Sequence, residues 1–149
     1  MKIEVTDLEN EIIYNARPGP QTIKLIEIEE QMDENYNTIV VMKFVNQWEE
    51  FHIEKFDPIR HRKRIYQIAS AIGEECFIKH DDGTISIDTD KMIGGYFRCS
   101  LEHVETKNGE ITRSLYIRDI KASTRRRDAT GSRHFKRLRR RKNDKTNVS

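Results

Sequence analysis

The sequence predicts a mainly β domain, a five-stranded barrel with one helix between its third and fourth strands, followed by a basic C-terminal arm. Short apolar runs alternate with polar residues and are separated by turn residues, which is typical of strands. One later run has helical spacing instead, and Lys and Arg dominate the end of the chain. A chain of 149 residues is long enough for one compact core with appendages.

The first predicted strand covers residues 22–31, after the Pro-Gly-Pro break at 18–20. Isoleucines alternate with glutamates in this run, as on a strand with one buried face. The apolar phase shifts between Leu25 and Ile26, which predicts a β-bulge at that point. Residues 1–15 alternate more weakly and predict only a short strand and a turn.

The second and third strands are predicted to form a hairpin. Residues 38–45 are apolar on both phases, which favours a buried central strand. In the run that follows, Phe51 and Ile53 alternate with polar residues. A two-residue turn at Asn46-Gln47 would place Met42 opposite Phe51, with both side chains on one face of the sheet.

A helix is predicted between Asp57 and Gly73. Asp57 is a good N-cap with proline at the next position, apolar residues recur at helical spacing, and Gly73 ends the run. The first turns carry a basic cluster, residues 60–64, close to the positive end of the helix dipole. We therefore expect either an anion or the acidic body of the domain beside this cluster.

The last two strands are predicted on either side of a turn at Lys107-Asn108-Gly109. A two-residue Asn-Gly turn would mix core and surface residues on one face. A three-residue loop with Gly109 in the left-handed conformation avoids this mixing, so we prefer it. The preferred register makes two core pairs, Leu101 with Leu115 and Cys99 with Ile117.

The same register places two arginines, Arg98 and Arg118, directly opposite each other on the other face. Like charges in this position repel each other unless something negative lies between them. A phosphate would relieve the repulsion, and so would the carboxylate of Glu102 or Asp119.

Three antiparallel strands, a helix and a closing hairpin is the element order of an OB barrel. Four segments also carry a family resemblance: PGPQTIKLIEIEE, VNQWEEFHIEKF, IYQIASAIG and DGTISIDTDKMIGGYFRCSLEHVETKNGE. Through them, residues 18–123 resemble small phage-encoded OB-type single-stranded-DNA-binding proteins from replication and recombination gene clusters. The resemblance implies DNA binding and replication or recombination proteins as partners. Many such proteins end in an acidic tail that recruits partners, whereas HFKRLRRRKNDK is basic.

Charge is segregated along the sequence. From Lys121 to the end the chain has twelve Lys and Arg against Asp128 and Asp144, a net charge of +10. The totals of 27 basic and 25 acidic residues leave 15 and 23 for residues 1–120, a net charge of −8. The predicted units are an N-terminal extension (1–17), a nucleic-acid-binding domain (18–123) and a flexible basic arm (124–149). We expect the arm to contact a polyanion.

The predicted function is non-catalytic, largely sequence-independent binding of single-stranded DNA, with RNA as an open alternative. Such binding needs aromatic rings on which bases stack and a basic track for phosphates. The candidate residues within the domain are Tyr36, Trp48, Tyr96, Arg98, Tyr116 and Arg118. Those in the arm are Arg125, Arg126, Arg127, Arg133, Lys136, Arg137, Arg139, Arg140, Arg141 and Lys142.

Other interpretations stay open. The acidic domain could bind a protein partner while the arm binds nucleic acid, the arm could fold back over the domain, or RLRRRK could be a nuclear import signal. The aspartates Asp81, Asp82, Asp88 and Asp90 suggest a metal-dependent nuclease, but they fit turns and caps equally well. We expect no cofactor, metal or catalytic residue, two reduced cysteines (Cys76 and Cys99), a cytoplasmic location and no membrane contact.

Overall fold

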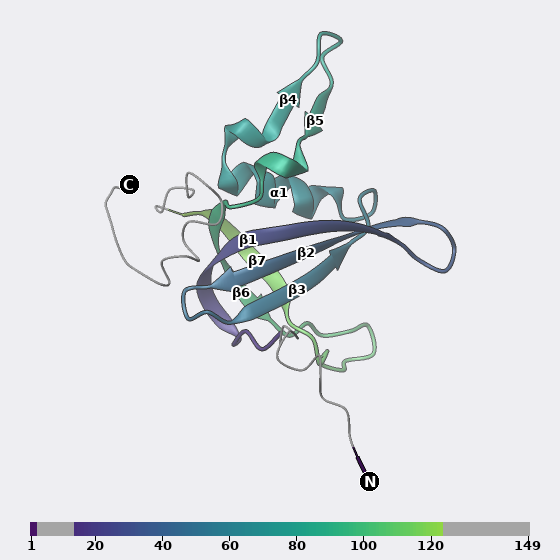
Figure 1. The fold of residues 1–149 in the computed structure, drawn as a ribbon, viewed down its shortest axis with the longest axis vertical. Helices are drawn as coiled ribbons and strands as arrows, with labels where there is room; N and C mark the ends of the chain where they lie inside the picture. The colour runs from purple at the N-terminus through teal and green to yellow at the C-terminus, as the bar shows by residue number, and fades with distance from the viewer. Residues whose placement is uncertain (3–13, 124–149) are drawn as a thin grey trace.

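The computed structural model describes residues 1–2 and 14–123 (Figure 1). The short strand predicted near the N-terminus and the basic arm therefore fall largely outside the described residues. Within the described part the fold is mainly β, as predicted. Its strands are β1 (Gly19–Met32), β2 (Thr38–Asn46), β3 (Phe51–Phe56), β4 (Phe77–Lys79), β5 (Ile85–Ile87), β6 (Tyr96–Glu102) and β7 (Tyr116–Ala122). Its helices are α1 (Arg62–Ile72) and two single 3-10 turns, η2 (Glu74–Cys76) and η3 (Thr89–Lys91).

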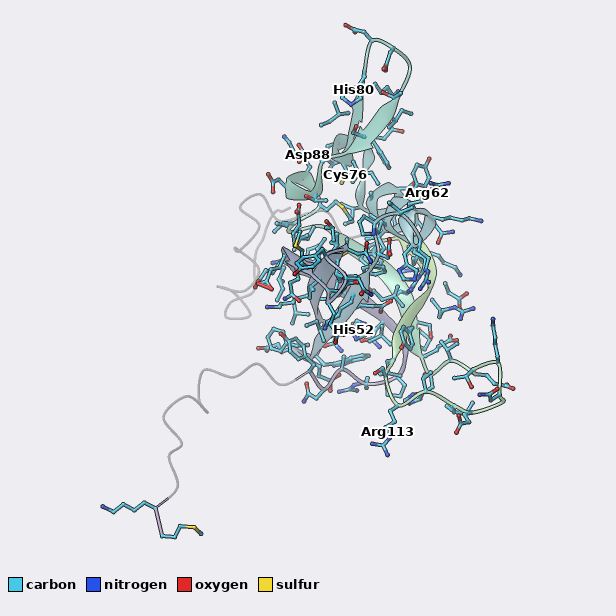
Figure 2. The ribbon with its side chains drawn as sticks, turned by 90° about the vertical axis from the view of Figure 1, so that its right-hand side faces the viewer. His52, Arg62, Cys76, His80, Asp88 and Arg113 are labelled. Atoms are coloured by element: carbon cyan, nitrogen blue, oxygen red, sulfur yellow. The ribbon has the colours of Figure 1, made fainter. Side chains whose placement is uncertain are left out.

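Five strands form one antiparallel sheet in the order β3-β2-β1-β6-β7. This order, with α1 between the third and fourth strands of the sheet, is consistent with the predicted OB-like fold. The sheet curls without closing, because no ladder of backbone hydrogen bonds joins β3 to β7 among the described residues. The small hairpin β4–β5 was not predicted; it projects beyond α1, with His80 near its tip (Figures 1 and 2).

The long strand β1 joins the two halves of the sheet. Its first part pairs with β6, from Gly19 to Lys24, and its later part pairs with β2, from Ile23 to Met32. The register with β2 shifts between Leu25 and Glu27, so the predicted bulge is confirmed. A bulge increases the local twist of a strand, which helps one strand to serve both halves of a curled sheet.

The core lies inside the curled sheet and is closed at one end by α1. It contains apolar side chains of every strand of the large sheet together with Ile65, Ile68 and Ala69 of the helix. Cys76 and Cys99 are buried and form no disulfide, as predicted. The aspartates that fit turns and caps in the sequence include two that do so here: Asp82 lies in a turn at 81–83, and the Asp88 carboxylate caps η3 by accepting a hydrogen bond from the Asp90 N–H.

The β2–β3 hairpin has a different register from the predicted one. A three-residue loop, 47–49, replaces the two-residue turn, with Glu49 in the left-handed region at φ 61°. The Asn46 carboxamide shapes this loop by accepting hydrogen bonds from the N–H groups of Trp48 and Glu50. Val45 therefore pairs with Phe51, and Met42 pairs with Glu54. The prediction that Met42 faces Phe51 was wrong, because the shift of three residues inverts the faces of β3.

The β6–β7 hairpin follows the predicted loop at its tip but not along its strands. Thr106 and Glu110 flank the three-residue loop, and Gly109 has φ 82° as predicted. Near the strands, the β7 side has two extra residues, Arg113 and Ser114. Figure 2 labels Arg113 in this connection. The ladder therefore pairs Leu101 with Ile117 rather than with Leu115. The predicted face of each strand is correct, because a shift of two residues preserves it.

The start of α1 was also predicted wrongly. Asp57 does cap a turn, since its carboxylate accepts hydrogen bonds from the N–H groups of Ile59 and Arg60. Regular α-helix, however, begins only at Arg62, after His61, whose imidazole accepts a hydrogen bond from the Asp57 N–H. The helix ends at Ile72 with Gly73 as the C-cap, as predicted.

Side chains join β3 to β7 where the ladder is missing. The Glu54 carboxylate, 4% exposed, accepts a hydrogen bond from the Ile117 N–H at 3.0 Å and one from the Arg64 guanidinium at 2.6 Å. The same Arg64 nitrogen donates to the Ile117 carbonyl at 2.6 Å. His52 Nε2 lies 2.8 Å from the Glu54 carboxylate, inside the sheet. We call this group, His52, Glu54, Arg64 and the backbone of Ile117, the seam.

Candidate nucleic-acid interface

Three exposed cations lie together on the outer face of β6 and β7. Arg98 pairs across the strands with Lys121, and Arg118 pairs with Ser100 on the same face. We call Arg98, Arg118 and Lys121 the cationic strip. The predicted pair of Arg98 with Arg118 was wrong, because the two-residue shift near the loop and one extra residue in β7, at the bulge with Asp119 at φ 53°, together move Lys121 into the place opposite Arg98.

The strip places like charges directly opposite each other. Arg98 and Lys121 occupy a cross-strand pair, a position where two cations repel. Within residues 14–123, no carboxylate forms an ion pair with Arg98, Arg118 or Lys121. The arrangement therefore has an unbalanced positive charge that a bound anion would neutralise.

Tyr116 lies at one end of the strip, on the same face as Arg118. It pairs with Glu102 and is half-buried, so part of its ring faces solvent. Tyr96 does not belong to this surface: it is 5% exposed, and the Lys24 ammonium lies 5.7 Å from its ring centroid. The prediction that Tyr96 stacks on a base is therefore wrong, because its ring is enclosed within the domain.

Trp48 lies in the β2–β3 loop and is 43% exposed. The Arg17 guanidinium stacks over its indole at 3.9 Å and forms an ion pair with Glu50. Hydrogen bonds from Arg17 and then from Asn46 lower the pKa of the Glu50 carboxyl to about 2. Trp48 therefore forms part of an ordered, exposed stack of an arginine on an aromatic ring.

Tyr36 lies at the tip of the β1–β2 turn and is 81% exposed, with φ 62°. It precedes β2, whereas Trp48 follows it, so the nine residues of β2 separate the two rings by about 30 Å. Trp48 is at the same end of the sheet as Tyr116, because both lie near the start of β1 in the register. Tyr36 thus stands apart from the other candidate rings.

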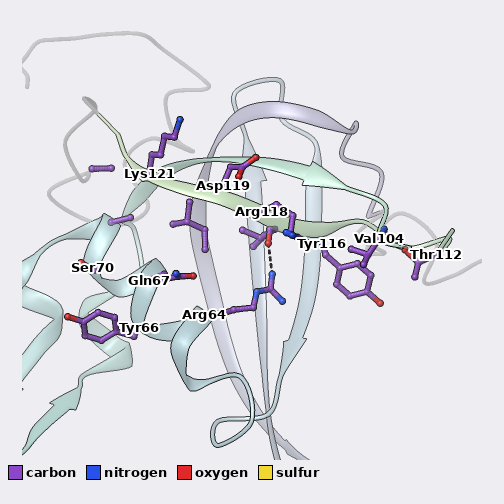
Figure 3. A pocket seen from close by; sticks show the side chains of 14 residues that line it. Arg64, Tyr66, Gln67, Ser70, Val104, Thr112, Tyr116, Arg118, Asp119 and Lys121 are labelled. Carbon is purple, nitrogen blue, oxygen red and sulfur yellow. Dashed lines mark hydrogen bonds between the residues drawn. The ribbon is translucent and has the colours of Figure 1, made fainter. Parts of the chain in front are cut away.

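A groove lies between α1 and the edge of β7 that has no neighbouring strand (Figure 3). Its volume is about 1100 Å³. Tyr66, Gln67 and Ser70 line it from the helix, and Arg118 and Lys121 are among its residues from β7. The groove therefore adjoins the cationic strip along the edge of β7.

No family model and no curated protein matches the chain. Its function is therefore inferred from the fold and from the geometry of these residues.

Several features of this surface were not predicted from the sequence. The sequence places Tyr66 in the helical run but does not show that its ring is exposed. It gives no sign of the Arg17 contacts, because the partners Trp48 and Glu50 are more than 30 positions away. Lys121 belongs to β7 and is the first residue of the strongly basic end of the chain. The predicted arm residues, from Arg125 to Lys142, lie outside the described residues.

The aspartates considered for a nuclease have local roles. Asp82 accepts hydrogen bonds from the hydroxyl and the N–H of Thr84, which lower the pKa of its carboxyl. Asp88 caps η3. Among the described residues no three His, Cys, Asp or Glu side chains gather as a metal site would require, and no helix is long and apolar enough to cross a membrane.

Proposed function

We propose that this protein binds single-stranded nucleic acid, DNA first among the candidates, without catalysing a reaction on it. The cationic strip holds phosphates, and the rings of Tyr116 and Trp48 at one end of the sheet stack on bases. The basic arm adds phosphate contacts that do not depend on sequence. Such a protein would act where single strands are exposed, as in replication and recombination.

One observation carries the proposal: Arg98 and Lys121 face each other across two strands, beside Arg118, with no ion-paired carboxylate in residues 14–123. Phosphates spaced along a strand match a row of cations, and their binding removes the repulsion between the cations. Two members of the strip also lie on β7, and residues 123–149, which follow it, have eleven Lys and Arg against two Asp, a net charge of +9.

The proposal is tested by titrating the full-length protein against fluorescein-labelled oligothymidine, a duplex and an RNA of equal length, at two salt concentrations. We expect the single strands to bind more tightly than the duplex. Replacing Arg98, Arg118 and Lys121 together by Gln should reduce the magnitude of the log–log salt slope by about 2, because three phosphates contribute about 0.7 each.

Lys79→Gln is the matched control, since Lys79 is exposed on β4, in the small two-stranded sheet and not on β6 or β7. It should leave the slope nearly unchanged. If no nucleic acid binds at low salt, or if the triple variant binds as the parent does, the strip has no such role. The labelled strand should also stay intact when magnesium or manganese is added.

A second candidate is an adaptor whose domain binds a protein partner while the arm alone binds nucleic acid. The net charge of −8 on residues 1–120 favours it, because that charge opposes nucleic acid overall. Ending the chain after Ser123 discriminates between the two. If the truncated domain still binds single strands more tightly than double strands, the cationic strip binds the nucleic acid. If binding is lost completely, the result supports the adaptor.

A further inference from the structure

The groove between α1 and β7 continues the surface of the cationic strip. We infer that a single strand bound on the strip passes over the free edge of β7 into this groove, where Tyr66 stacks on a base and Arg64 binds a phosphate. This inference rests on the proposed function and assigns a second contact region to the same strand. Figure 3 shows Tyr66 and Tyr116 toward opposite ends of the groove.

Tyr66 has the exposure that a stacking ring needs. It is 54% exposed on α1, and its ring centroid lies 5.3 Å from that of Phe77, which supports the ring. Ser70 follows four residues later on the same face of the helix, and Gln67 is its exposed neighbour. The hydroxyl and the carboxamide can donate and accept hydrogen bonds with a sugar or a base edge.

Arg64 is already oriented for an anion. One of its terminal nitrogens is held by Glu54 and by the Ile117 carbonyl, and its guanidinium lies 5.2 Å from the Phe56 ring centroid. A guanidinium has five N–H donors, so this anchoring leaves donors for a ligand. The Arg64 side chain is 28% exposed and lines the groove. Fixing the group in advance lowers the entropy lost when it binds a phosphate.

The edge of β7 favours nucleic acid over an added peptide strand. A peptide strand needs a regular row of N–H and C=O groups, but the seam already binds those of Ile117, and Asp119 forms a bulge. Bulges at a sheet edge oppose strand addition. The charged residues that line the groove are Arg64, whose charge Glu54 balances, and Arg118 and Lys121 against Asp119; the remaining net positive charge favours a polyanion.

The first test uses the full-length protein and a fluorescein-labelled 20-residue oligothymidine. Stacking of one base contributes on the order of fivefold or more to affinity, so Tyr66→Ala should weaken binding at least about fivefold. Tyr66→Phe keeps the ring and should bind within about twofold of the parent. Equal thermal unfolding of the variants shows that the fold is intact, as the exposure of Tyr66 leads us to expect.

The second test reverses charge inside the groove. Gln67→Glu should weaken binding and Gln67→Lys should strengthen it, with the salt slope rising by about 0.7 in magnitude for the lysine variant. Gln31→Glu is the matched control, because it adds the same charge at an exposed position near the far end of β1. It should change affinity less than twofold.

The outcomes separate this inference from the proposed function. If Tyr66→Ala and both Gln67 variants bind as the parent while the strip variants lose affinity, the groove is not used and the inference is wrong, although the proposed function stands. If poly-glutamate of equal charge competes as well as unlabelled oligothymidine, binding in the groove depends on charge alone, and the stacking role of Tyr66 is refuted. If the parent binds no nucleic acid at all, both proposals fail.

Discussion

Removing the Glu54 carboxylate should destabilise the domain strongly, although the side chain is polar. Glu54→Ala takes away the acceptor of the buried Ile117 N–H, and an unsatisfied buried N–H costs about 1–3 kcal/mol. It also removes the partner of Arg64, for which a fully buried pair would lose about 3–5 kcal/mol. Arg64 is 28% exposed, so water screens its charge and reduces that second loss.

The expected total is a loss of about 3 kcal/mol in the free energy of unfolding. Urea denaturation followed by Trp48 fluorescence and far-ultraviolet circular dichroism measures it. Lys55→Ala, at the exposed neighbour on the same strand, is the control and should cost under about 0.5 kcal/mol.

A double-mutant cycle with Arg64→Ala isolates the pair. The double variant should be more stable than the sum of the single effects implies, by at least about 1 kcal/mol, because both side chains serve one network. A loss below about 1 kcal/mol for Glu54→Ala, or strict additivity in the cycle, would refute the claim that these side chains hold β3 to β7.

Three further predictions concern single residues. Burial, with the neighbouring Glu54 carboxylate adding to it, raises the pKa of the Cys99 thiol to about 12. Cys99 should therefore resist iodoacetamide at pH 8 until the protein unfolds, and fast labelling of the native protein would contradict this. The raised pKa contributes stability that is complete below about pH 9 and is lost as the pH rises toward 12. The Glu50 carboxyl, whose pKa is lowered to about 2, contributes stability above its ordinary pKa of 4.5 that disappears as the pH falls through 2; side-chain NMR titration should give the low value in the parent and an ordinary one in Arg17→Ala. Glu49→Gly should stabilise the β2–β3 loop by up to about 1 kcal/mol in urea denaturation, because Glu49 has φ 61°, whereas Gly at an exposed position with negative φ, such as Lys55, should destabilise.

Features set by local chemistry were predictable from the sequence. The bulge after Leu25, the end of α1 at Gly73, the cap at Asp88 and the left-handed Gly109 each follow from a few adjacent residues. These signals depend on backbone preferences that act over one turn or one strand pair. They were enough to predict the class of fold and the order of α1 and the five strands of the large sheet, but not the β4–β5 hairpin.

Features set by distant side chains were not predictable. The polar face of β3 points inward because His52 and Glu54 find partners in Arg64 and Ile117, residues that the sequence places far away. A pattern of alternating apolar residues favours the opposite face, which is why the β2–β3 register was wrong. Burial of a carboxylate becomes favourable only once those partners are present.

The candidate surface divides in the same way. Arg98, Arg118 and Tyr116 were predicted on one face because strand alternation alone puts them there. Tyr96 lies two residues before Arg98, so alternation along β6 predicts that both side chains are exposed on the same face. The Tyr96 ring is nevertheless buried by neighbouring residues, which alternation alone cannot predict. The groove was missed because it needs α1 and β7 side by side, and these are separated by more than 40 positions.

Among the described residues, the side chains of Glu54 and Arg64 join β3 to β7, and no ladder does. A ladder opens cooperatively because several backbone hydrogen bonds break together, whereas this junction opens when one carboxylate rotates. The amide proton of Ile117 should therefore exchange with solvent at a rate set by the rotamer of Glu54, so a single proton reports how often β3 and β7 separate.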